Sequence, residues 1–181
     1  MTTEAFVGLG SNIDPERHLN IALKKIRDRL TFIEMSSVYR NAAVGFIGDD
    51  FLNLVIRLQC TSGPVALEKI LSEIEQASGR QRTSSSTGAQ AIRSRTLDLD
   101  LLLYGSVVDP DLGLPRSDVL HYAFVLRPLA ELSPELVHPV TGRIMRVEWE
   151  AAVDQSPLMQ PQQIFTADQR GVILGCLLSI D

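Results

Sequence analysis

The apolar residues of the chain follow two spacings, and the order of these spacings predicts the secondary structure. Four stretches have the continuous or alternating apolar pattern of strands, and two have apolar residues every three or four positions, as in amphipathic helices. The predicted strands are 5–9, 33–40, 51–60 and 97–104, and the predicted helices are 15–30 and 64–79. Asp14 and Pro15 are expected to cap and open the first helix.

The order strand, helix, strand, strand, helix, strand is typical of an α+β fold of the ferredoxin-like type, an antiparallel sheet with helices on one face. Beyond Tyr104 the pattern is weaker. It predicts a short helix at 125–132, one or two turns of helix at 147–153, a Pro/Gln linker at 157–163 and a last strand at 172–178.

The predicted strand 51–60 has two unlike faces. Its even positions are the apolar Leu52, Leu54, Ile56 and Leu58, which we expect to face the core. Phe51 and Asn53 share the opposite face, where a phenyl ring is unusual. A flat heterocycle stacked on Phe51 and hydrogen-bonded to Asn53 explains both residues. An ordinary, partly exposed aromatic residue explains the strand equally well.

Asp98 and Asp100 are two residues apart on another predicted strand, so both carboxylates project from one face, and the alternating residues Leu97, Leu99 and Leu101 project from the other. Paired carboxylates suit Mg²⁺, which proteins often hold with one or two carboxylates and the phosphates of a substrate. Taken alone, the pair is better explained as an exposed polar strand face.

A polar Ser/Thr segment, 83–88, is flanked by four cations: Arg80, Arg82, Arg93 and Arg95. A solvated charged loop is the ordinary interpretation of this segment, and Glu75 before it is interpreted as a solvated carboxylate. Because Arg forms paired hydrogen bonds with phosphate oxygens, the segment is also consistent with a mobile loop that closes over a phosphate ligand.

The amino-acid composition of the chain argues against some classes of binding partner. The 181 residues include 17 basic and 22 acidic side chains, for a net charge of -5, which opposes a nucleic acid partner. Cys60 and Cys176 form no disulfide framework or zinc pattern. The N-terminus lacks a signal peptide, and no apolar run suits a membrane span, so we expect a cytoplasmic protein without a membrane partner.

Several known motifs are missing. Gly8 and Gly10 lack the third glycine of a dinucleotide fingerprint, and the chain has no P-loop. The three histidines have no zinc spacing, and no serine has the context of an acyl-transfer nucleophile. An RNA-binding module shares the predicted element order, but its aromatic strand signature is absent.

Six segments together resemble the 6-hydroxymethyl-7,8-dihydropterin pyrophosphokinase (HPPK) family of folate biosynthesis. They are VGLGSN at 7–12, SSVYR at 36–40, FLNLV at 51–55, IEQASGRQR at 74–82, RTLDLDLLLYG at 95–105 and FVLRPLAELSPELVHP at 124–139. The resemblance implies a catalytic domain at 1–139 with an extension at 140–181 packed on or near it. It also implies transfer of diphosphate from MgATP to the pterin hydroxymethyl group, with release of AMP.

The resemblance assigns roles to individual residues. Asp98 and Asp100 would hold two Mg²⁺ ions, and the catalytic set implied is Arg80, Arg82, Arg95, Asp98 and Asp100. The pterin-binding residues implied are Val44, Phe51, Asn53 and Phe124. The ATP-binding residues implied are Glu75, Arg82, Arg95, Leu99, Arg116 and Tyr122. ATP and the pterin are the expected small-molecule partners, and the oligomeric state stays open.

This chain departs from the family pattern at several places. Asn41-Ala42-Ala43 replaces a proline-containing pterin loop, and the loop between Arg82 and Arg95 is longer than usual. Arg116 stands where the family has His, and Tyr122 where it has Arg. Two alternatives to an active HPPK therefore remain: a divergent relative with a changed pterin or phosphate donor, and a catalytically poor protein that binds pterin or nucleotide.

Overall fold

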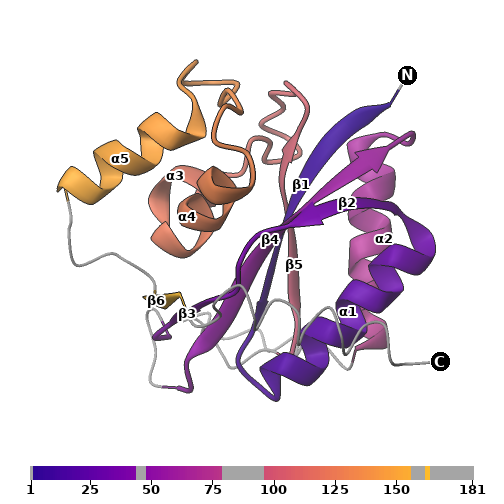
Figure 1. Cartoon of the computed structure of the whole chain (residues 1–181). Coiled ribbons are helices and arrows are strands. Elements are labelled where there is room, and N and C mark those ends of the chain that lie inside the picture. The colour runs from indigo at the N-terminus through magenta and orange to yellow at the C-terminus, as the bar shows by residue number, and fades with distance from the viewer. Residues whose placement is uncertain (1, 44–47, 79–95, 156–161, 164–181) are drawn as a thin grey trace, which may run out of the picture.

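The computed structural model describes residues 2–43, 48–78, 96–155 and 162–163. Within them the backbone forms a sheet in the order β5-β1-β4-β3-β6, with β2 also paired to β4 (Figure 1). All the strand pairs are antiparallel. This is the predicted ferredoxin-like arrangement, and α1 and α2 occupy the predicted positions between the strands.

The central strand β1 (Thr3–Ser11) lies between β4 (Phe51–Cys60) and β5 (Asp98–Tyr104). Leu9 pairs with Leu54 on one side and Leu99 on the other. These three leucines are buried in one apolar cluster. The predicted inward orientation of the even positions of β4 is therefore confirmed.

One predicted strand, 33–40, is two strands in the structure: β2 (Thr31–Met35) and β3 (Tyr39–Asn41). Both pair with β4. Between them the Ser36 hydroxyl accepts a hydrogen bond of 3.0 Å from the Val55 N–H, which interrupts the regular backbone ladder. β3 also pairs with β6 (Gln162–Gln163).

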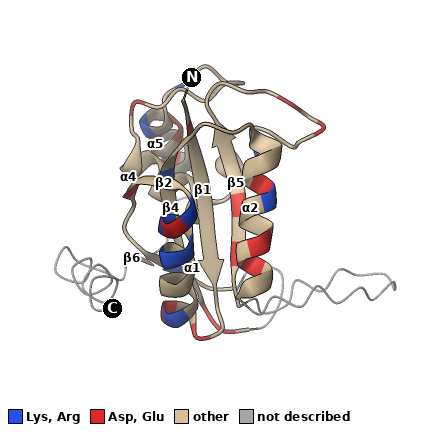
Figure 2. Cartoon of the chain, turned by 90° about the vertical axis from the view of Figure 1, so that its right-hand side faces the viewer, with Lys and Arg blue, Asp and Glu red and all other residues tan. Residues whose placement is uncertain are grey.

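Helices α1 (Pro15–Arg29) and α2 (Pro64–Ala77) cover one face of the sheet (Figure 2). Their apolar sides form the main core with the strands, and their outer sides carry charged residues. Pro15 opens α1 as predicted. The expected capping role of Asp14 is wrong, because its backbone is left-handed, with φ of 41°, and its side chain makes no cap hydrogen bond.

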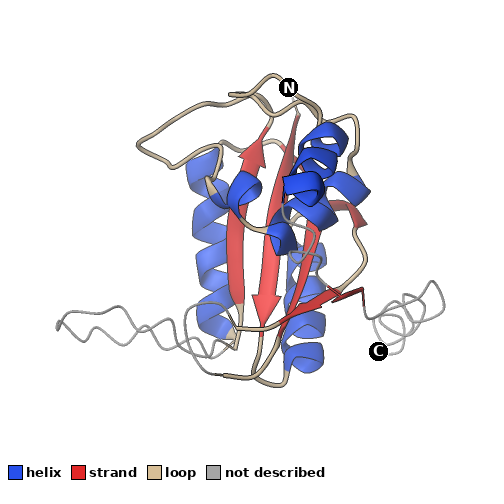
Figure 3. Ribbon diagram, turned by 90° about the vertical axis from the view of Figure 1, so that its left-hand side faces the viewer, coloured by secondary structure: helices blue, strands red, loops and turns tan. Residues whose placement is uncertain are grey.

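Helices α3 (Asp118–His121), α4 (Ala123–Leu132) and α5 (Met145–Gln155) lie against the other face and cover one end of it (Figure 3). Their apolar residues pack in a second cluster with Phe6, Val55 and Leu102 of the sheet. α5 is longer than the one or two turns predicted at 147–153. The strand expected at 172–178 lies outside the described residues.

None of the helices in the described ranges is long and apolar enough to cross a membrane.

Candidate active site

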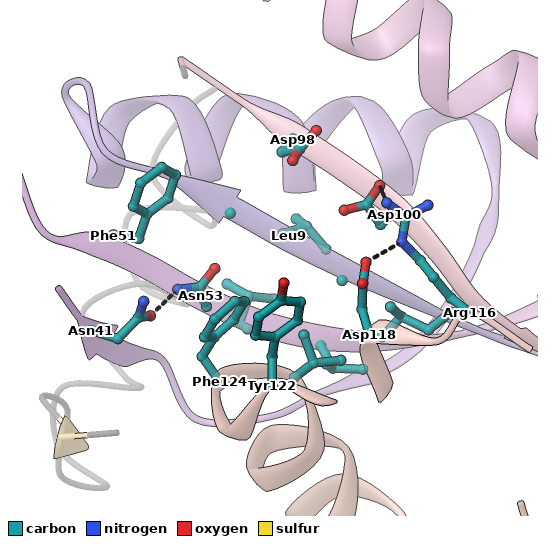
Figure 4. A pocket seen from close by; sticks show the side chains of 16 residues that line it. Leu9, Asn41, Phe51, Asn53, Asp98, Asp100, Arg116, Asp118, Tyr122 and Phe124 are labelled. Carbon is teal, nitrogen blue, oxygen red and sulfur yellow. Dashed lines mark hydrogen bonds and ion pairs between the residues drawn. The ribbon is translucent and has the colours of Figure 1, made fainter. Parts of the chain in front are cut away.

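A pocket of about 280 Å³ opens on the face of the sheet that α3–α5 leave partly uncovered. Its walls come from β1, β4 and β5, from the end of β3, from the starts of α3 and α4, and from the segments just before these two helices. The pocket has two ends (Figure 4). Asp98 and Asp100 of β5 lie at one end, and Phe51 and Asn53 of β4 lie at the other, with β1 between them.

Two glycines of β1 form the floor between these ends. Gly8 pairs with Asp100 on one side and Val55 on the other, while Gly10 pairs with Asp98 and Asn53. A Cβ atom on Gly10 would lie 2.8 Å from the Asn53 Oδ1 atom, so only glycine leaves this space open. The sequence presents these glycines as an incomplete dinucleotide motif and as part of the VGLGSN segment of the HPPK resemblance, and it gives no sign that they form the floor of a pocket.

Asp98 and Asp100 project into the pocket, whereas Leu97, Leu99 and Leu101 are buried in the core on the opposite face. The predicted separation of the two faces is confirmed. Burial, followed by the negative charge of Asp98, raises the pKa of Asp100 to about 6, although nearby Arg116 opposes the shift. The site therefore concentrates negative charge in a place where a cation is favourable.

Arg116 lies beside these carboxylates. Its Nη2 atom is 3.0 Å from Asp100 Oδ1, and its Nε atom is 2.6 Å from Asp118 Oδ2. Burial lowers the pKa of Arg116, but Asp100 and Asp118 outweigh it, so the net shift is upward. Sequence reasoning missed Asp118. An acidic residue two positions after Arg116, at the start of a short helix, was the available signal.

Aromatic rings line the opposite end. Phe51 comes from β4 and Phe124 from the first turn of α4. The rings of Tyr122 and Phe124 are stacked, with centroids 5.0 Å apart and planes inclined by 20°. The Phe124 ring lies between Tyr122 and Asn53 (Figure 4). Tyr122 therefore supports one face of an aromatic wall.

Asn53 is buried, with 8% of its surface exposed, and its amide is held in place from β3. Its Nδ2 atom donates a hydrogen bond to the Asn41 Oδ1 atom. Asn41, predicted only as part of a departure from the family pattern, thus lines the pocket and orients Asn53. The residue pattern of a single strand cannot predict this contact, because Asn41 and Asn53 belong to different strands.

Comparisons with known proteins identify the family and the fold of this chain. The family model described as 7,8-dihydro-6-hydroxymethylpterin-pyrophosphokinase (HPPK) matches residues 6–134. This chain belongs to the HPPK family. A 2-amino-4-hydroxy-6-hydroxymethyldihydropteridine pyrophosphokinase of Synechocystis is 33% identical over 89% of this chain and 88% of its own length. The enzyme of the same name from Haemophilus influenzae is 33% identical over 75% of this chain and 84% of its own.

A solved structure of Plasmodium falciparum HPPK-DHPS shares the fold. It superposes on 92% of this chain with a TM-score of 0.70 at 12% sequence identity. The chain spans about half of that protein, covering 48% of its length. The similarity confirms the fold that the order of strands and helices predicted.

Two residues that the HPPK resemblance assigned to ATP lie away from the pocket lining. Glu75 of α2 is buried, with 3% of its surface exposed, and its Oε1 atom accepts a hydrogen bond of 2.8 Å from the Leu99 N–H. The interpretation of Glu75 as a solvated carboxylate is therefore wrong, since α2 packs against β5 at this point. The Leu99 side chain lies in the core. Contacts of either residue with ATP stay predictions.

Other predicted HPPK residues lie outside the described residues. They are Val44, Arg80, Arg82 and Arg95, together with Arg93 and the polar segment 83–88. The pocket therefore brings together Phe51, Asn53, Asp98, Asp100, Arg116, Tyr122 and Phe124 of the predicted set. In the described part of the chain, no group of three or more His, Cys, Asp or Glu residues forms a complete metal site from protein atoms alone.

Proposed function

We propose that this member of the HPPK family transfers the β,γ-diphosphate of ATP to the hydroxymethyl oxygen of 6-hydroxymethyl-7,8-dihydropterin in folate biosynthesis. The observation that carries this proposal is the shared pocket, in which a carboxylate pair and an aromatic-amide end are separated only by the glycine floor. Such a pocket suits a flat heterocyclic substrate that binds at the aromatic-amide end and receives an anionic group at the carboxylate end.

The aromatic end would hold the pterin. Phe51 and Phe124 offer ring faces for stacking, and the amide of Asn53 can donate and accept hydrogen bonds along the edge of a heterocycle. Asn53 is already oriented by Asn41, so little side-chain entropy is lost when the ligand binds. This is the arrangement that the unusual face of β4 predicted.

The carboxylate end would hold Mg²⁺. The donors fit this ion, because Asp98 and Asp100 supply oxygen ligands from one strand face, and burial and then the neighbouring charge of Asp98 raise the pKa of Asp100. Phosphate oxygens of ATP would complete the coordination. We propose two ions, as the family resemblance implies. When bound, they would neutralise charge on the phosphates and favour ionisation of the attacking hydroxyl.

The reaction requires little covalent chemistry from the protein. The pterin hydroxymethyl oxygen forms a bond to the β-phosphorus of ATP, the bond from that phosphorus to the α,β-bridging oxygen breaks, and AMP leaves with that oxygen. The hydroxyl proton is released. Catalysis then consists of holding the oxygen in line with the leaving group and stabilising charge on phosphate oxygens. Among the described residues, Arg116 lies where it can stabilise charge on the phosphate oxygens. Arg80, Arg82 and Arg95 are proposed to contribute in the same way.

The proposed domain organisation also has support. The family model ends at residue 134. Met145 and Trp149 of α5 pack in the same apolar cluster as Leu126 and Leu129 of α4. We propose a catalytic domain at 1–139 and an extension at 140–181 whose described helix packs on it.

The test is an assay of AMP release from ATP, Mg²⁺ and the authentic dihydropterin, with ATP alone as the blank. We expect pterin-dependent AMP in equal amounts with the pterin diphosphate, and loss of both products with Asp100→Asn. Phe51→Ala should weaken pterin binding by about 1–3 kcal/mol and leave ATP binding nearly unchanged. Binding of both ligands without AMP would instead identify a binding protein. AMP formed only with another pterin or nucleotide would identify a changed substrate.

A further inference from the structure

Arg116 occupies an unusual position in a pocket that is expected to bind metal. Among the described lining residues it is the only Lys or Arg, and it faces the carboxylates of Asp98, Asp100 and Asp118. It touches Asp100 through Nη2 at 3.0 Å and Asp118 through Nε at 2.6 Å (Figure 4). The guanidinium therefore neutralises part of the charge that would attract a divalent ion.

The contact with Asp100 conflicts with metal binding at the same carboxylate. Asp100 Oδ1 already forms an ion pair with Arg116, and a divalent ion on this group would lie within a few ångströms of the guanidinium, where like charges repel. The side chain of Arg116 is 41% exposed, so it has room to move. Its backbone is fixed, because the Arg116 N–H donates a hydrogen bond of 2.9 Å to the Leu102 carbonyl oxygen.

We propose that Arg116 is an internal counter-cation that competes with the metal for Asp100 in the nucleotide-free protein and transfers to the phosphates when metal and nucleotide enter together. Asp118 is the positioning residue for this exchange. It holds the Nε atom of Arg116, whereas Asp100 holds a terminal nitrogen, so Asp118 can retain the guanidinium after Asp100 is released. This role rests on the proposed assignment of Asp98 and Asp100 as metal ligands.

The exchange affects the affinity for free metal and the affinity for nucleotide in opposite directions. Without nucleotide, the metal must displace a bound cation that gains no new partner, so free metal binds weakly. With nucleotide, the triphosphate supplies anionic oxygens for the displaced Arg116, so metal and nucleotide each favour binding of the other. Removal of Arg116 should therefore tighten the binding of free metal and loosen the binding of nucleotide. A residue that only supports the pocket would weaken both.

The test measures Mn²⁺ binding to the full-length protein by electron paramagnetic resonance, with and without a non-hydrolysable ATP analogue. Mn²⁺ serves as the probe because it takes the same oxygen ligands as Mg²⁺. We expect Arg116→Ala to bind Mn²⁺ about three- to tenfold more tightly without nucleotide, and the analogue at least about fivefold more weakly. Arg146→Ala removes the same charge from an exposed site with partners Glu135 and Glu150, and should change neither value.

A double-mutant cycle tests Asp118. Asp118→Asn should weaken binding of the analogue, and should weaken it no further in the Arg116→Ala background, since Asp118 acts through Arg116. An equal loss of analogue affinity from Asp118→Asn in the wild type and in Arg116→Ala would overturn the positioning role of Asp118. Unchanged or weaker Mn²⁺ binding in Arg116→Ala without nucleotide would overturn the competition. The metal assignment has a test of its own. If Asp98 and Asp100 hold the metal, Asp98→Asn and Asp100→Asn should each abolish Mn²⁺ binding to the protein in the presence of the analogue.

Discussion

The two faces of the sheet are built from the same strands but differ in what they do. On the face beneath α1 and α2, strand residues such as Val7, Leu54 and Leu99 form a continuous apolar core. On the pocket face, neighbouring positions of the same strands are Gly8, Gly10 and the two aspartates of β5. Because strand side chains alternate, adjacent residues can serve stability and chemistry independently. Substitutions one residue apart should separate these two properties.

The adjacent pair Asp98 and Leu99 gives the largest expected contrast. Asp98→Asn keeps the size of the side chain and should preserve the melting temperature, while turnover falls by at least about a hundredfold through loss of charge that binds metal. Leu99→Ala should lower the free energy of unfolding by about 2–5 kcal/mol through a cavity in the core. Thermal melts measure the stability of both variants, and AMP release measures their turnover. Comparable turnover in wild type and Asp98→Asn at saturating Mg²⁺ would contradict the division of the faces.

Glu131 of α4 tests whether the pocket face depends on polar contacts for its stability. Its carboxylate accepts hydrogen bonds from the Ser37 N–H and hydroxyl and from the Tyr39 hydroxyl at 2.7 Å, at the break between β2 and β3. Glu131→Ala removes the acceptor that these buried donors share, so we expect the free energy of unfolding, measured by chemical denaturation, to fall by about 2–4 kcal/mol. The KM for pterin should rise as well, since β3 carries Asn41.

Glu131→Gln is the conservative comparison, because it keeps one acceptor oxygen and removes the charge. Burial first, and then the contact with Glu131, raises the pKa of Tyr39 to about 12. In the Gln variant the Tyr39 pKa should move back toward its ordinary value, which ultraviolet titration of the tyrosines can follow. A Tyr39 titration identical in the two proteins would show that the carboxylate charge does not act on this hydroxyl.

The glycine floor offers a smaller and more local test. Gly10→Ala places a methyl group 2.8 Å from the Asn53 Oδ1 atom, whereas at Gly8 the nearest atom is a Leu102 side-chain carbon at 3.5 Å, an ordinary contact. We expect Gly10→Ala to weaken pterin binding roughly tenfold, about 1.4 kcal/mol, by displacing the amide. Gly8→Ala should have a smaller effect. Calorimetric titration with the pterin compares them, and a larger loss at Gly8 would mean that floor space, not Asn53, sets the affinity.

The smallest expected effect concerns pH and a histidine remote from the pocket. His138 is buried, and its Nδ1 atom accepts hydrogen bonds of 3.3 Å from the N–H groups of Val140 and Thr141. Burial lowers the pKa of His138 in the folded state. The unfolded chain therefore takes up the proton first. The stabilisation is complete above the unfolded pKa of about 6.5 and is lost as the pH falls below it.

Urea denaturation of wild type and His138→Gln between pH 5 and pH 8 measures this contribution. The stability of the wild type should decline more steeply toward acid than that of the variant. Parallel curves would mean that other groups account for the acid sensitivity. Turnover at neutral pH should be unchanged in the variant, because His138 lies in the loop before α5, away from the pocket lining.

Much of the fold follows from residue spacing, because burial of one strand face imposes a period of two. The ends of β4 and the opposed orientations of Asp98 and Leu99 could be predicted in this way. Spacing carries no information about which residues meet across loops. Asp118 reaches the site only because the chain after β5 turns back, with the Arg116 N–H bound to Leu102. The burial of Glu75 likewise depends on the way α2 packs beside β5.

The contact between Glu75 and Leu99 also bears on how this protein behaves at high concentration. In the described part of the chain β5 ends the sheet on one side, and an unpaired strand edge can recruit a strand from another molecule. The Glu75 carboxylate takes the outward Leu99 N–H, so an incoming strand meets a buried acid in place of a free donor. On the opposite side of β4 lie β2 and β3, and β3 is bordered in turn by β6, which is only two residues long. The β5 border is therefore a poor template for aggregation through strand addition.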